Sequence, residues 1–238
     1  MNKFQTLASA TLLALLCTAC TTPLKLEPQA ANTQLAATSN DELLIKSQQF
    51  HTVTISPHSV VAAPGKPWRF YVQIKNGSAL DVPFNSKDVS VSLNGQRMAL
   101  LSTDAVRARI MSAHDTALAQ ARDMQKRVIY GDIDRLDSPD SLDKVDGEEW
   151  NPGSSLFDIH AKQKETDQHI KSIEAKTKAQ LADINQHALA SQNLQPGQTY
   201  ETFIEFIPPS TLQSGDILSI KIGVEPDVHT FGFLLSQS

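Results

Sequence analysis

Two cysteines are the only thiol groups in this 238-residue chain, and they close a single apolar run. Cys17 and Cys20 follow a short cationic start, residues 1–3, and an uncharged stretch that begins at Phe4. The chemistry open to them is acylation or disulfide formation. The uncharged run is shorter than the roughly 20 residues that a membrane-spanning helix needs. It has the pattern of a secretory signal peptide, with small residues before the cleavage point.

The end of the run, Cys17-Thr18-Ala19-Cys20, resembles the lipobox of bacterial lipoproteins, in which small residues precede an obligatory cysteine. The typical lipobox has Leu where this chain has Cys17, and bulky Leu16 argues against Cys17 as the modified residue. The resemblance implies cleavage after residues 1–19 and acylation of Cys20, which anchors the chain in a lipid bilayer as a palmitate-bearing lipoprotein. Thr21 replaces the Asp that commonly retains such proteins at the inner membrane, so the resemblance implies the outer membrane of the cell envelope. An ordinary cleaved signal peptide is the alternative.

Cleavage and acylation leave no free thiol, so the fold is expected to hold together without a disulfide. The formal net charge of −5 at pH 7 becomes −6 when Lys3 is lost with the signal peptide. A mildly acidic protein is a poor nucleic-acid binder. Residues 21–40 are small and polar without a stable period, so residues 20–49 are expected to form the lipidated cysteine and a flexible tether. About 20 such residues average roughly 25 Å end to end.

The densest group of carboxylates lies in residues 131–153, which hold eight acidic and two basic side chains. Oxygen ligands at this density can bind calcium, but no register of the twelve-residue EF-hand loop fits. Starting at Asp137, for example, Leu142 stands where glycine is required. We therefore expect a solvated acidic loop without a metal. Trp150 is unusual in such a loop, and with Asp137 and Asp140 it is predicted to contact a partner.

No catalytic motif is evident: the chain lacks a G-x-S-x-G elbow, a Walker loop and a dinucleotide fingerprint. Its seven histidines include no pair at the i, i+4 spacing of a helical metal site. His169 and His187 share a helix face five turns apart and are expected at the surface. The chain is predicted to be no enzyme and to use no cofactor. A cell-wall-acting enzyme is kept as an alternative, with Glu201 or Glu205 as the acid to test.

Alternating apolar and polar residues predict several β-strands. The clearest covers residues 67–76 and turns Trp68 and Phe70 to one face; Trp68 is expected in the core. The others are expected in 51–57, 80–84, 88–101, 198–209, 216–225 and 228–236. Asn94-Gly95 should close a tight hairpin, because both central positions need positive φ.

The two blocks of predicted strands, 51–101 and 195–238, hold 95 residues together. An immunoglobulin-like sandwich needs about 100 residues and about seven strands, and neither block alone buries a core. We therefore predict an α+β fold: an antiparallel immunoglobulin-like β-sandwich, made of residues 50–101 and 194–238. It is interrupted by a long α-helical hairpin, residues 102–193.

Within the insertion, apolar or small residues recur every three or four positions from Val106 to Val128 and again from Ile159 to Ala188. Helices of about 27 and 36 residues follow, with Gly131 ending the first. Ala, Thr and Gln fill much of the seam, which predicts weak coiled-coil pairing. Such an arm either gains stability from a partner, pairs with a second copy in a homo-oligomer, or serves as a solvated spacer.

These features together predict an envelope lipoprotein that acts as a non-enzymatic binding or structural module. We expect its partner to be an envelope protein that is engaged by the helical arm or by the sandwich. A periplasmic adaptor of an efflux or secretion complex is the alternative, because such adaptors are often lipid-anchored and carry a helical hairpin in a β domain. That resemblance is architectural only, and the chain lacks recognisable lipoyl-like flanks.

Overall fold

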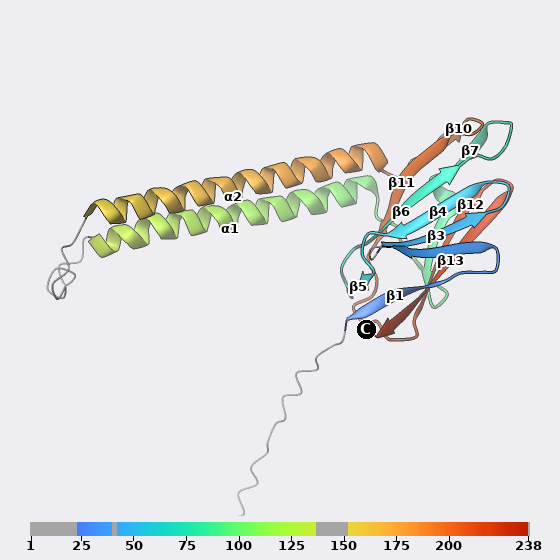
Figure 1. Cartoon of the computed structure of the whole chain (residues 1–238), viewed down its shortest axis with the longest axis horizontal. Helices are drawn as coiled ribbons and strands as arrows, with labels where there is room; N and C mark the ends of the chain where they lie inside the picture. Colours follow the sequence, from blue (N-terminus) through green and yellow to red (C-terminus); the bar gives the residue numbers. More distant parts are fainter. Residues whose placement is uncertain (1–22, 40–41, 137–151, 238) are drawn as a thin grey trace, which may run out of the picture.

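The computed structural model describes residues 23–39, 42–136 and 152–237. Within these residues the chain is a mixed α+β protein with thirteen strands, paired antiparallel, and two long helices. The strands form a sandwich-like head from which the helices extend side by side (Figure 1). The predicted signal peptide, Cys20, Asp137, Asp140 and Trp150 lie outside the described residues. No described helix is long and apolar enough to cross a membrane.

Two large sheets and one small sheet make up the head. The six-stranded sheet has the order β5 (Val61–Ala62), β1 (Leu24–Gln29), β13 (Asp227–Gln237), β12 (Ile217–Val224), β8 (Val89–Leu93) and β9 (Gln96–Met98). The five-stranded sheet has the order β11 (Thr199–Phe206), β6 (Trp68–Lys75), β4 (Thr52–Pro57), β3 (Glu42–Gln48) and β2 (Gln34–Ser39). The small sheet pairs β7 (Val82–Phe84) with β10 (Gln192–Leu194).

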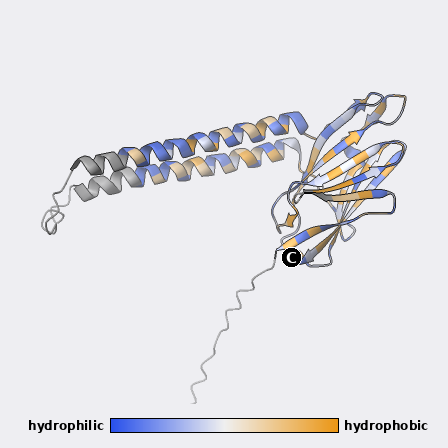
Figure 2. Cartoon of the chain, viewed as in Figure 1, coloured by the Kyte–Doolittle hydropathy of each residue, from blue (hydrophilic) through white to orange (hydrophobic). Residues whose placement is uncertain are grey.

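The core lies between the two large sheets. Phe70 of β6 stacks on Phe206 of β11 and also contacts Phe233 of β13, whose ring centroid is 5.2 Å away. Trp68 is buried as predicted, and its indole N–H donates to the carbonyl of Ala63 at 3.0 Å. Figure 2 shows the alternation of apolar and polar residues along the strands that places one face of each sheet in this core.

The predicted tether over residues 20–49 is wrong for most of its length, because it contains β1, β2 and β3. β1 pairs with β13 and buries Leu24 and Leu26, and β3 pairs with β4 and buries Leu43 and Ile45. Each of these strands has only a short period-two pattern. They add to sheet edges that already exist, so packing against a neighbour rather than intrinsic propensity determines their conformation.

The hairpin predicted at Asn94-Gly95 is confirmed, with φ of 50° and 81°. It joins β8 to β9. The Asn94 side chain also accepts from the backbone N–H of Ile217 and donates to Asp216, which fixes the turn against the start of β12.

The helices are α1 (Thr103–Leu136) and α2 (Pro152–His187). Side-chain contacts between them pair rising with falling residue numbers, so they run antiparallel: Arg107 with Asn185, His114 with Thr177, and Gln125 with Asp167.

Both predicted boundaries of the acidic loop shift. α1 continues through Gly131, where the sequence predicted its end, because an interior glycine costs a helix only about 1 kcal/mol and still donates its backbone N–H. α2 begins at Pro152, a residue favoured in the first helical turn. It ends at His187 rather than near 193, because residues 192–194 form β10 and bury Leu194. These last residues of the predicted insertion therefore belong to the sandwich.

Candidate functional site at the junction of helices and sheet

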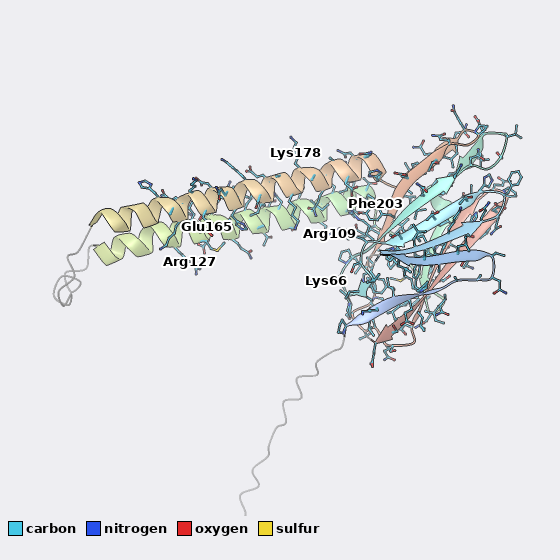
Figure 3. All side chains as sticks on the ribbon, in the orientation of Figure 1. Lys66, Arg109, Arg127, Glu165, Lys178 and Phe203 are labelled. Carbon is cyan, nitrogen blue, oxygen red and sulfur yellow. The ribbon has the colours of Figure 1, made fainter. Side chains whose placement is uncertain are left out.

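Charged side chains gather where the helices meet the outer face of the five-stranded sheet. The register of β6 and β11 places Arg69 opposite Glu205, and Tyr71 opposite Phe203. These side chains point away from the sandwich core because the inward positions belong to residues such as Phe70. Phe203 and Glu205 are nevertheless buried, since α1 and α2 cover this end of β11 (Figure 3).

Glu205 is the centre of the cluster, with a side chain only 2% exposed. Its Oε2 accepts a hydrogen bond from Nε of Arg69 at 3.0 Å and forms an ion pair with Nη2 of the same guanidinium, also at 3.0 Å. Its Oε1 accepts from Nη2 of Arg109 on α1. A buried carboxylate is costly unless its oxygens are paired, and here two guanidinium groups occupy both.

Arg69 extends the cluster to the second helix. Its Nη1 donates to Oδ2 of Asp183 on α2 at 2.8 Å, and its guanidinium lies 4.1 Å from the centroid of the Phe203 ring. The other carboxylate oxygen of Asp183 lies 3.0 Å from Nδ1 of His187, one helical turn further on. One network therefore joins β6, β11, α1 and α2.

An apolar cluster reinforces this junction. Val106 and Ile110 of α1 and Ile184 of α2 are buried against Phe203. Backbone contacts add to it: Leu101 donates to the carbonyl of Glu205 at 2.7 Å, and the Thr202 hydroxyl donates to the carbonyl of His187 at 3.0 Å. The two helices are thus attached to the sheet by their bases, through both packing and paired charges.

The geometry suits a structural clamp better than acid–base catalysis. Both oxygens of Glu205 are occupied, so neither is available to a substrate. Glu201, the other acid considered from the sequence, is exposed and accepts from Nε2 of Gln73 at 2.9 Å. Four residues apart on one strand, the Cα atoms of Glu201 and Glu205 are about 13 Å apart. Glycoside hydrolases direct a pair of carboxyl groups at one bond, whereas here one carboxylate is buried between two arginines and the other is exposed on the sheet.

A second polar cluster, around His51 and His229, was not predicted. Both rings are fully buried. Nδ1 of His51 accepts from the backbone N–H of Gly77 at 3.2 Å, and Nε2 donates to the carbonyl of Glu225 at 3.0 Å. The His51 backbone N–H donates to Oδ2 of Asp227 at 2.7 Å.

The His229 ring is less completely paired. Its Nδ1 lies 2.9 Å from the Ser47 hydroxyl, whereas Nε2 makes no hydrogen bond within the described part of the chain and lies 3.8 Å from Oδ2 of Asp227. Burial lowers the pKa of His229 below its ordinary value, an effect that Asp227 opposes and His51 reinforces. This cluster ties β3 and β4 to the turn between β12 and β13.

Of the other residues singled out in the sequence, the structure describes the two helical histidines. His169 is exposed as predicted, whereas His187 is half-buried against Asp183. Cys20, Asp137, Asp140 and Trp150 lie outside the described residues, so lipidation and partner contact at these positions stay predictions. Across the part of the chain that the structure describes, no three His, Cys, Asp or Glu side chains are grouped to hold a metal ion.

Comparison with known proteins adds no assignment: the chain matches no model of a protein family, and no curated protein or solved structure is significantly similar to it.

Proposed function

We propose that this chain is an envelope lipoprotein, anchored through acylated Cys20 at the outer membrane, that acts as a non-enzymatic binding or structural module. In this proposal α1 and α2 form a helical hairpin inserted in an immunoglobulin-like sandwich, and the hairpin engages an envelope protein. The observation that carries the proposal is the way in which the base of the arm is attached to the sheet. Glu205, Arg69, Arg109 and Asp183 fix its base to the sheet, while the rest of the arm extends away from the head (Figure 1).

The start of β1 supports a close attachment to the bilayer. Three residues separate Cys20 from Leu24, the first residue of β1. They span at most about 14 Å. Leu24 pairs with Ala62 on one side and Gln237 on the other. An acyl group on Cys20 would therefore hold this end of the sandwich beside the membrane. The arm would then be the part that extends far from this end, because α1 alone is about 50 Å long.

Lipidation is tested by metabolic labelling with palmitate and by membrane fractionation. Cys20→Ser should abolish the label and release the protein from the membrane fraction, because the lipobox places acylation there. Cys17→Ser is the matched control, since it removes the neighbouring thiol and should leave both readouts unchanged. Equal labelling of wild type and Cys20→Ser would overturn the anchor.

The role of the arm is tested by photocrosslinking in cells. Probes at Arg127 of α1 and Glu165 of α2 sample exposed positions far from the head, and a probe at Lys66 samples an exposed position on the head (Figure 3). A dominant adduct from both arm positions and none from Lys66 would support the proposal and supply the partner for mass spectrometry. An adduct with a second copy would identify a homo-oligomer. Adducts from Lys66 alone would overturn the arm as the docking element.

A further inference from the structure

The outer face of the five-stranded sheet carries a trough beside the base of α2. One hollow of about 350 Å³ has Ser56, Tyr71, Gln73 and Glu201 on its sheet side and Asp183 and His187 on its helix side. A second hollow of about 420 Å³ is lined by His58, Arg109 and Gln180, among others. The two hollows share Tyr71 and Asp183, so Tyr71 stands at the middle of one continuous trough. Each hollow is within the size range of small-molecule sites.

Tyr71 is an aromatic side chain held in place but left partly uncovered. Its ring packs edge-on against His58 with centroids 5.8 Å apart, and its hydroxyl lies 3.4 Å from Nδ1 of His58. The residue is still 38% exposed, whereas its strand neighbour Phe203 is buried beneath the helices. Leu44, which is 41% exposed, also lines the trough. An ordered, half-exposed ring offers a flat apolar surface at little cost in conformational entropy.

Hydrogen-bonding groups of both kinds surround this ring. Gln73 and Glu201 line the trough as a hydrogen-bonded pair. Thr54 and Ser56, which carry hydroxyl groups, line it from the neighbouring strand β4. Asp183 is neutralised by Arg69, and Arg109 is paired with Glu205. The charges along the trough are thus largely compensated, which disfavours a strongly charged ligand. A ligand with many hydroxyl groups fits better, because each hydroxyl both donates and accepts.

We propose that this trough binds an uncharged oligosaccharide, with the C–H face of one sugar ring against Tyr71. Gln73, Glu201 and Asp183 then form hydrogen bonds with its hydroxyl groups. The separation of Glu201 from the fully paired Glu205 makes this a binding site and not a site of cleavage. The inference does not depend on lipidation of Cys20 or on an arm partner, since it rests on residues of the sheet and the base of α2.

The test is isothermal titration calorimetry of the purified full chain with three uncharged sugars: cellotetraose, maltotetraose and tetra-N-acetylchitotetraose. We expect at least one of them to bind with a Kd of about 1 mM or tighter. Tyr71→Ala should weaken that Kd at least about tenfold, whereas Tyr71→Phe should retain most of the affinity because it keeps the ring. Glu201→Gln, at an exposed position that does not threaten the fold, should weaken it as well.

Leu80→Ala is the matched control, because it removes a side chain that is 75% exposed and does not line the trough. It should leave the Kd unchanged. Failure of all three sugars to bind at about 10 mM would overturn the proposal. So would equal affinity of wild type, Tyr71→Ala and Glu201→Gln, because binding would then lie elsewhere.

Discussion

Arg69 and Asp183 are 114 residues apart in the chain, yet Nη1 of the guanidinium lies 2.8 Å from Oδ2 of the carboxylate. This contact crosses from the outer face of β6 to α2. Because Arg69 also binds Glu205, and Glu205 binds Arg109, the same network reaches β11 and α1. This network joins the apolar cluster of Val106, Ile110, Ile184 and Phe203 in attaching the base of the arm to the head.

Glu205→Gln should lower the free energy of unfolding by about 3 kcal/mol, because it removes the buried carboxylate that pairs with both Arg69 and Arg109. Glu201→Gln is the matched control on the same face of the same strand. Its exposed side chain should change stability by no more than about 0.5 kcal/mol. Urea unfolding followed by circular dichroism measures both, and similar effects of the two variants would show that the cluster does not stabilise the junction.

Arg69→Gln should loosen the arm, because it breaks the ion pairs of Arg69 with Asp183 and with Glu205 and leaves Glu205 paired with Arg109 alone. Spin labels at Lys66 on the head and Lys178 on α2 report the effect by pulsed electron paramagnetic resonance (Figure 3). The distance distribution should broaden in Arg69→Gln. Arg127→Gln is the control, since it removes only the exposed pair with Asp123, and its distribution should match that of the wild type. A narrow distribution in both variants would mean that packing alone fixes the arm.

Secondary structure and burial were best predicted from the sequence for strands with one face in the core and the other in solvent. The alternation in residues 67–76 predicted β6 and the burial of Trp68, because period-two burial is a local property. The charge cluster around Glu205 could not be predicted from the sequence. Glu205 was considered only as an acid, and nothing local connects Arg69 to Asp183, because helical spacing does not say which sheet a helix base covers. The burial of His51 and His229 likewise depends on bringing β3, β4 and the β12–β13 turn together.

Leu26→Ala tests the strands found in the region predicted as a tether. Leu26 is 6% exposed and pairs with Leu235 of β13, so its truncation should destabilise the fold by about 2–4 kcal/mol. Leu35→Ala is the matched control in the same region, because Leu35 is 70% exposed, and it should cost no more than about 0.5 kcal/mol. Chemical unfolding measures both variants. Equally small losses of stability in the two variants would favour the predicted tether and show that β1 does not unfold cooperatively with the rest of the sandwich.

The buried His229 should make the fold lose stability as the pH falls. Its pKa is lowered in the folded state, mainly by burial, relative to about 6.5 in the unfolded chain. Above that value both states are neutral and the stability is fully present. Below it the unfolded chain takes up a proton that the folded ring resists. The free energy of unfolding should therefore decrease with a slope of up to about 1.4 kcal/mol per pH unit.

Two variants separate His229 from the other titrating groups. Asp227→Asn removes the carboxylate that opposes the lowering of the His229 pKa, so the folded-state pKa should fall further. The loss of stability should then extend over a wider range of acidic pH. His169→Gln changes an exposed histidine and should leave the pH profile as in the wild type. Melting temperatures between about pH 5 and pH 8 provide the comparison. A profile that Asp227→Asn leaves unchanged would place the acid sensitivity of the fold outside the His51–His229 cluster.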